Sequence, residues 1–84
     1  MTVRLFVKSG CPWCDEAMEW LDGRNIDYTL LNVTGDAEAR NEMRELTGQG
    51  KAPSIDVNGE ILADFGADEL EAWWEEKGFP VGEK

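Results

Sequence analysis

Short segments with alternating strand-like and helix-like apolar patterns constrain the fold of this chain most. Apolar residues alternate over residues 3–7, whereas over residues 13–23 they recur at the spacing of an amphipathic helix. Glycines end several of these segments, and Asn58-Gly59 is a strong signal for a tight hairpin turn. We therefore expect strands over residues 3–7, 27–33, 52–57 and 60–63, and helices over residues 13–23, 36–47 and 64–77. The predicted order of elements is β-α-β-α-β-β-α.

The size and charge of the chain argue against several classes of function. Its 84 residues suffice for one small domain, which we assign to residues 1–84. No apolar run is long enough to span a membrane, and the first ten residues lack a basic segment followed by an apolar one. We therefore expect a cytoplasmic protein. The net charge of −10 repels nucleic acid and anionic membranes. It would suit basic partners, although solubility is the simpler explanation.

Histidine is absent, and both cysteines, Cys11 and Cys14, follow the first predicted strand. The absence of histidine excludes Cys-His nucleophile pairs, serine triads and His-ligated metals. A structural zinc site needs about four ligands, so two thiols in one chain predict no metal site. A stabilising disulfide is a weak explanation, because closing a four-residue loop contributes only roughly 2 kcal/mol, against ~4.7 kcal/mol for a hundred-residue loop.

The position of Cys11 favours redox chemistry. It lies at a turn between a strand and a helix, and Pro12 suits the first helical turn because it has no N–H to leave unpaired there. Unpaired amides and the helix dipole favour a thiolate at such a position, where cysteine pKa values fall from ~8.5 to between ~3.5 and 7.5. Cys14, one turn further on, is within reach to resolve a mixed disulfide. A Cys-x-x-Cys beside a β-α-β pattern indicates a thioredoxin-like redox site.

The sequence resembles the glutaredoxins over nearly all of its 84 residues. "CPWC" (residues 11–14) is similar to the family's Cys-Pro-aromatic-Cys site, with tryptophan where tyrosine is usual. Lys8 precedes the first cysteine by three residues, as the family's lysine does. "KAPS" (51–54) resembles the family's Thr-Val-Pro stretch. "FGADEL" (65–70) resembles the turn and helix start that hold one end of glutathione.

This resemblance implies a thioredoxin fold, in which a four-stranded mixed sheet carries helices on both faces. It implies that Cys11 attacks a substrate disulfide and that either Cys14 or glutathione resolves the mixed disulfide. No bound cofactor is implied, because glutathione acts as the reductant. The implied glutathione-binding residues are Lys8, Trp13, Lys51, Ala52, Pro53, Gly66, Ala67 and Asp68.

The resemblance also divides this site into parts. Lys8, together with Lys51, would bind the glycyl carboxylate of glutathione. A cis peptide bond before Pro53 would leave the N–H and C=O of Ala52 free to pair with the cysteinyl backbone. The charge of Lys8 would also favour the thiolate form of the nucleophile.

The γ-glutamyl end of glutathione would meet Asp68 and the amides around Ala67, and the Trp13 ring would line a groove for thiol substrates. Asp68 lies near the start of a predicted helix, so an N-cap or first-turn role alone would also explain it. The family's usual Gly-Gly before the last helix is replaced by Phe65-Gly66, whose bulk could fill this part of the pocket.

That departure is closer to the small redoxins that feed ribonucleotide reductase and are reduced by thioredoxin reductase. The expected function is glutathione-dependent reduction of protein disulfides and glutathione mixed disulfides by a monomer, with the reductase-coupled redoxin as the alternative. A further alternative is a carrier in which Cys11 thiolates of two chains and two glutathiones hold a [2Fe–2S] cluster. The expected partners are therefore glutathione and disulfide-containing proteins or, for the redoxin, ribonucleotide reductase and thioredoxin reductase. Nucleic acids and membranes are not expected partners.

Overall fold

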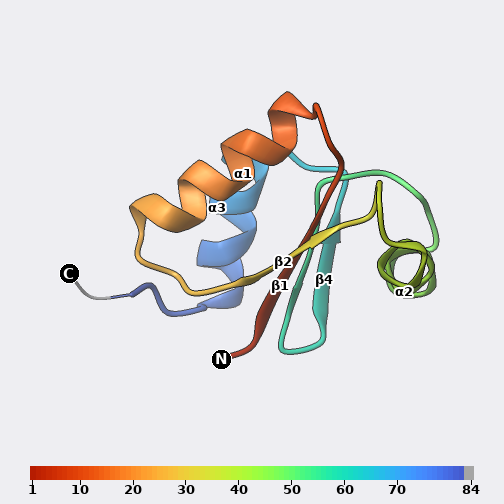
Figure 1. Ribbon diagram of the computed structural model, residues 1–84. Coiled ribbons are helices and arrows are strands. Elements are labelled where there is room, and N and C mark those ends of the chain that lie inside the picture. Colours follow the sequence, from red (N-terminus) through yellow and green to blue (C-terminus); the bar gives the residue numbers. More distant parts are fainter. Residues whose placement is uncertain (83–84) are drawn as a thin grey trace.

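A computed structural model describes residues 1–82 as a four-stranded sheet flanked by three helices (Figure 1). The elements are β1 (Val3–Val7), α1 (Pro12–Gly23), β2 (Thr29–Asn32), α2 (Ala37–Thr47), β3 (Ser54–Val57), β4 (Glu60–Ala63) and α3 (Ala67–Lys77). The strand order is β2-β1-β3-β4, with β1 and β2 parallel and the other neighbours antiparallel. The predicted mixed sheet and the predicted order of elements are confirmed.

Helices cover both faces of the sheet, and each face has its own apolar core. Figure 1 shows α1 and α3 together on one side of the sheet and α2 alone on the other. Fully buried members of the larger core, on the side of α1 and α3, include Leu5, Leu21, Ile55 and Leu70. The smaller core, on the side of α2, consists of Phe6, Val33, Ala39 and Met43. The central strand β1 serves both cores, because successive side chains of a strand point to opposite faces.

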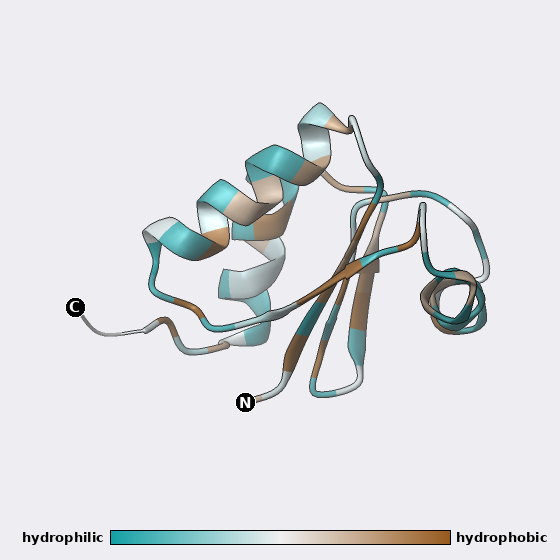
Figure 2. Cartoon of the chain, in the orientation of Figure 1, coloured by the Kyte–Doolittle hydropathy of each residue, from teal (hydrophilic) through white to brown (hydrophobic). Residues whose placement is uncertain are grey.

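The hydropathy of the chain follows this layering. Figure 2 shows apolar segments along the strands and hydrophilic residues over much of the outer surface of α1. The buried residues of α1 are Cys14, Ala17 and Leu21, which recur at helical spacing on one face. Burial of that face positions the first turn of α1 against the larger core, so the second cysteine lies inside the protein.

Local sequence explains the ends of α2. The Asp36 side chain accepts hydrogen bonds from the backbone N–H groups of Glu38, at 3.0 Å, and Ala39, at 3.2 Å. This is an N-cap interaction, which satisfies amides that have no partner within the helix. Gly48 ends the helix with a left-handed φ of 75°, as predicted from its position.

The hairpin between β3 and β4 also follows the sequence signal. Asn58 and Gly59 have φ values of 54° and 92°. Two-residue hairpin turns that match the strand twist require positive φ at both positions, which these residue types tolerate. The hairpin brings β4 back along β3, with Ser54 opposite Ala63, and so places the start of α3 near the start of β3.

The boundaries of five elements and the position of one side chain differ from the prediction. β3 starts at Ser54 rather than at residue 52, and α1 and α2 each start one residue away from the expected position. The strand expected over 27–33 is β2, which starts at Thr29, because the ladder with β1 begins there. The last helix starts at Ala67 rather than at residue 64, because Asp64 has a left-handed φ of 55° and the next side chain, Phe65, turns into the core. Leu46, whose spacing from Ala39 and Met43 predicts a place on the inner face of α2, is 38% exposed near the end of that helix.

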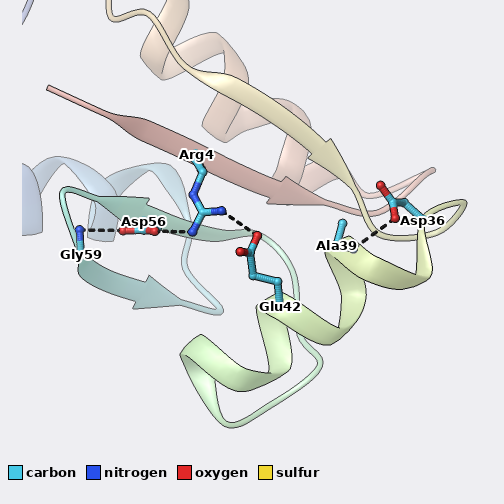
Figure 3. A network of polar contacts seen from close by, with 6 residues as sticks. All are labelled: Arg4, Asp36, Ala39, Glu42, Asp56 and Gly59. Carbon is cyan, nitrogen blue, oxygen red and sulfur yellow. Dashed lines mark hydrogen bonds and ion pairs between the residues drawn. The ribbon is translucent and has the colours of Figure 1, made fainter.

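A three-residue ion-pair network joins α2 to the sheet (Figure 3). The guanidinium of Arg4 on β1 donates to Glu42 of α2 at 2.6 Å and to Asp56 of β3 at 2.7 Å. The bond to Glu42 and, to a smaller extent, the bond to Asp56 hold the pKa of Arg4 above its usual value. Asp56 also accepts the N–H of Gly59 at 2.8 Å, so the network extends into the hairpin.

Aromatic side chains join the helices on the other face. Trp20 of α1 and Trp74 of α3 meet edge to face at 5.5 Å between ring centroids, and Phe79 packs against Trp74 at 5.2 Å. The Arg24 guanidinium lies over the Trp20 ring at 4.1 Å from its centroid. These contacts fix α3 relative to α1, which matters because the candidate site lies between the first turns of these helices.

Candidate active site

Cys11 is the N-cap residue of α1. Its backbone is extended, with φ −103° and ψ 107°, and its Sγ accepts a hydrogen bond from the backbone N–H of Cys14 at 3.2 Å. Gly10, with φ 70°, turns the chain out of β1, and Pro12 takes the first helical position. The sulfur thus lies where a serine or aspartate oxygen lies at an ordinary N-cap. Negative charge on that sulfur would be stabilised by the N–H bond and by the helix dipole.

The two thiols differ strongly in accessibility. Cys11 is half-buried, whereas Cys14 is 1% exposed, and both are free thiols. Burial raises the pKa of the Cys14 thiol to about 12, and its hydrogen bond with Cys11 acts in the same direction, while a backbone hydrogen bond from Lys8 opposes them. Cys14 is therefore protonated at neutral pH in the reduced protein. An incoming disulfide meets Cys11 first.

Trp13 lies between the two cysteines in the first turn of α1. Its side chain is 58% exposed, and its ring lies against Gly66, at the turn before α3. A Cβ atom on Gly66 would come within 2.8 Å of the ring atom Cζ3, so only glycine leaves room for this approach. The Phe65 side chain turns into the larger core, where it is 3% exposed, and the residue also lines a hollow beside Trp13.

The loop before β3 lies beside the same turn. The peptide bond between Ala52 and Pro53 is cis, as the resemblance implied. Pro53 is buried, and its C=O accepts the N–H of Asp64 at 2.9 Å, which ties this loop to the segment after β4. The Ser54 hydroxyl donates to the C=O of Lys51 at 2.9 Å and closes the loop on itself.

Two hollows flank Trp13. The first measures about 280 Å³ and the second about 360 Å³. The first is lined by Trp13, Ala52, Pro53, Asp64, Phe65, Gly66 and Glu69. The second is lined by Trp13, Glu16, Gly66, Ala67, Asp68 and Glu69. Six of the predicted glutathione-binding residues therefore line one hollow or both, and neither hollow is lined by a cysteine.

The two predicted lysines lie outside these linings. The Lys51 ammonium is 3.6 Å from the Asp64 carboxylate, and both side chains are exposed. Lys8 is exposed directly after β1, and within residues 1–82 its side chain forms no ion pair. Lys51, which the resemblance assigned to the glycyl carboxylate of glutathione, is therefore already paired with a carboxylate of this chain.

Of the two structural roles expected for Asp68, the N-cap role is wrong and the first-turn position is confirmed. The N-cap of α3 is Gly66, and Asp68 lies in the first turn. The residue that satisfies the N-cap amide is Glu69, whose Oε1 accepts the N–H of Gly66 at 3.3 Å. A glutamate three residues after the N-cap is half of a capping box, and that spacing was available in the sequence.

Sequence reasoning missed three carboxylates that line the hollows, namely Glu16, Asp64 and Glu69. Glu16 follows the cysteines in the sequence, where acidic residues are typical of a solvated helix face. Asp64 and Glu69 come from a turn and a helix some fifty residues later. Their position beside Trp13 depends on how α3 packs on α1, which no local pattern reveals.

Comparison with known proteins identifies the family. A family model of the glutaredoxins matches residues 3–62. The chain is 35% identical over 69 residues to an uncharacterized glutaredoxin-like 8.6 kDa protein in the rubredoxin operon of Clostridium pasteurianum, covering 82% of this chain and 92% of that one. It is 29% identical over 70 residues to glutaredoxin 3 of Escherichia coli K12, covering 83% and 82%. The chain belongs to the glutaredoxin family, whose members are thiol–disulfide oxidoreductases.

Solved structures agree on the fold. The thioredoxin-like protein BC3987 superposes with a TM-score of 0.78 and 27% identity, covering 84% of this chain and 97% of that one. The glutaredoxin-like protein NrdH-redoxin from Escherichia coli gives a TM-score of 0.74 at 19% identity, covering 86% and 93%. The predicted thioredoxin fold is thus confirmed.

Residues 1–82 contain neither a cluster of acidic or thiol side chains suited to a metal ion nor a helix suited to a membrane. No cluster of three or more Cys, Asp or Glu side chains is placed to hold a metal ion in this part of the chain. Nor does any helix there have the length and apolar character needed to cross a membrane.

Proposed function

We propose that this protein reduces disulfide bonds of other proteins, and mixed disulfides of glutathione, through the Cys11/Cys14 dithiol, with glutathione as the reductant that restores it. The observation that carries the proposal is the asymmetry of the thiols. Cys11 is accessible at a helix N-terminus, and Cys14 is buried one turn below it with its N–H on the Cys11 sulfur.

The chemistry is thiol–disulfide exchange in two steps. The Cys11 thiolate attacks one sulfur of the substrate disulfide, that S–S bond breaks, and the released sulfur takes up a proton. Cys14 then loses its proton and attacks the Cys11 sulfur of the mixed disulfide, which releases the second substrate thiol and leaves a Cys11–Cys14 disulfide. Two glutathione molecules restore the dithiol and become glutathione disulfide.

The raised pKa of Cys14 fits this order of events. Two of the influences that raise it, a hydrogen bond and a charge interaction, come from Cys11 itself. Both weaken once the Cys11 sulfur is bound in a mixed disulfide, so Cys14 becomes easier to deprotonate when it is needed. Asp15 also raises the pKa of Cys14 by its charge, and that influence remains throughout.

A second candidate reductant is thioredoxin reductase, as in the redoxins that serve ribonucleotide reductase. The lining of the hollows favours it, because carboxylates oppose a tripeptide that carries two carboxylates of its own. Lys51, expected to bind one end of glutathione, is engaged by Asp64. The first hollow beside Ala52 and Pro53, and the sequence similarity to glutaredoxin 3, support glutathione.

A coupled assay decides between the two. Oxidised protein is supplied either with glutathione, glutathione reductase and NADPH, or with thioredoxin reductase and NADPH, and reduction of a protein disulfide is followed by NADPH absorbance. Turnover with glutathione supports the first proposal. Turnover with thioredoxin reductase alone would replace it by the second. If the pre-reduced protein reduces no disulfide at all, both are wrong.

A further inference from the structure

The surface beside Cys11 combines an exposed aromatic ring with a carboxylate-lined hollow on each side. Trp13 lines both hollows and is 58% exposed. We call these two hollows the acidic groove, whose acidic members are Glu16, Asp64, Asp68 and Glu69. Within residues 1–82, one of these four carboxylates forms an ion pair, namely Asp64 with Lys51. The groove therefore presents an excess of negative charge around Trp13, two residues after Cys11 in the sequence.

One of these carboxylates occupies the position that an incoming anion would use. Gly66, Ala67 and Asp68, at the N-terminus of α3, line the groove, and helix N-termini favour negatively charged groups. Here the Glu69 side chain already accepts the N–H of Gly66, the N-cap amide. An acidic substrate would have to displace the Glu69 carboxylate and would be repelled by the other carboxylates of the groove. A cationic substrate would be attracted by all of them.

The Trp13 ring adds a second affinity for cations. The face of a tryptophan ring attracts ammonium and guanidinium groups, and tryptophan is the strongest aromatic partner for them. The same pairing occurs elsewhere in this chain, where Arg24 lies over the Trp20 ring at 4.1 Å. A lysine or arginine side chain beside Trp13 could therefore contact the ring and a groove carboxylate together.

We propose that the acidic groove binds lysine or arginine side chains that flank the disulfide of a protein substrate, so that basic disulfide-containing segments are its preferred substrates. This rests on the dithiol reaction of the proposed function and is independent of which reductant restores the dithiol. In one turnover, Cys11 and Cys14 give up two electrons and two protons, and the substrate disulfide becomes two thiols. The groove acts on binding beside Cys11 and leaves that chemistry unchanged.

Two synthetic peptides test the proposal in a single turnover. Both carry the same disulfide between the same uncharged residues, flanked by four lysines in one peptide and by four glutamates in the other. Pre-reduced protein is mixed with each peptide, and its oxidation is followed by acid quenching, alkylation and mass analysis. The rate of each peptide with dithiothreitol, a neutral dithiol, corrects for the intrinsic reactivity of its disulfide.

The corrected rate should be at least about tenfold higher for the lysine peptide at low salt. The preference should largely disappear near 0.5 M salt, where the screening length is only a few ångströms. The variant Glu16→Gln/Asp68→Asn/Glu69→Gln should lose most of the preference for the lysine peptide at low salt. The control variant Glu45→Gln/Glu75→Gln/Glu76→Gln removes as much charge from exposed positions outside the groove and should keep it.

Each other outcome overturns the proposal in a recognisable way. Equal corrected rates for the two peptides would remove the proposed substrate class and leave the dithiol function intact. Equal loss of preference in both triple variants would assign the effect to net charge instead of the groove. Failure to reduce either peptide would refute the proposed function as well. Should the first variant unfold, Glu16→Gln/Asp68→Asn leaves the Glu69 bond to Gly66 in place and should still reduce the preference severalfold.

Discussion

Carboxylates on the two sides of the sheet have opposite surroundings. On the side of α2, Glu42 and Asp56 both bind the Arg4 guanidinium at less than 3 Å (Figure 3). Beside the thiols, Glu16 and Asp68 have no ion pair within residues 1–82. The same type of side chain is thus used for structure in one region and left available for partners in the other.

This contrast separates stability from reactivity. The Arg4 network connects three elements through a partly buried group, so its loss should be felt in folding. The thiol site is built from backbone turns and a glycine contact, and its charged groups face solvent. Substitutions there should alter reaction rates and substrate preference while the free energy of unfolding changes little.

The largest effect should come from Cys11→Ser, which acts on the thiol region alone. Turnover of any disulfide should fall by at least about 10³-fold, because the attacking sulfur is gone. Cys14→Ser is the matched control and should keep turnover of a small glutathione mixed disulfide while losing most reduction of protein disulfides. Both are measured in the coupled assay, and an active Cys11→Ser protein would show that the nucleophile is misassigned.

Arg4→Met should have the converse effect. It leaves Asp56, whose side chain is 11% exposed, without its cation, and should lower the free energy of unfolding by about 2–3 kcal/mol. Glu42→Gln removes only the more exposed partner and should cost under about 1 kcal/mol. Urea unfolding gives both values, and the single-turnover rate should be unchanged. A stability loss equal in the two variants would contradict the role given to Asp56.

The buried thiol should make stability depend on pH above the ordinary range. The pKa of Cys14 is about 12 in the folded protein, against an ordinary value of 9.0. Between these values the unfolded chain loses the proton while the folded chain keeps it. The free energy of unfolding should therefore fall as pH rises, by up to about 1.4 kcal/mol per pH unit.

This dependence is isolated by comparing reduced parent protein with Cys14→Ser in urea at several pH values from 9 to 11. Other groups titrate in both proteins, so the difference between the two curves reports Cys14. A difference that does not change with pH would show that the Cys14 thiol is less protected than the structure indicates.

The sequence predicts the two thiols of the site better than it predicts the surface around Trp13. The roles expected of Cys11 and Cys14 rest on a local strand–turn–helix pattern, and the structure leaves Cys11 more accessible than Cys14. The contact between Trp13 and Gly66 joins residues more than fifty positions apart, and it depends on how α3 packs on α1. The N-cap of α3 is Gly66 rather than Asp68, and the spacing of Gly66 and Glu69 in the sequence could have indicated this. The start of α3 at Ala67 rather than at residue 64 depends on the left-handed backbone of Asp64.

The smallest expected effect concerns that turn. Asp64→Asn keeps a residue type that tolerates positive φ, removes one carboxylate from the first hollow and releases Lys51. If glutathione is the reductant, its KM should fall by about two- to fivefold with little change in kcat, since both groups are exposed. Glu45→Gln, outside the groove, is the control. A KM that rises in Asp64→Asn would mean that the carboxylate helps to bind glutathione.

Competitive alkylation of the reduced protein tests the central claim, the division of roles between the thiols, most directly. Trypsin should release residues 9–24 as one peptide that contains both cysteines, because Lys8 and Arg24 flank it. After brief treatment with limiting iodoacetamide at neutral pH, fragmentation of this peptide locates the label. The account predicts that Cys11 carries nearly all of it. Equal labelling of Cys14, or faster labelling, would contradict the account.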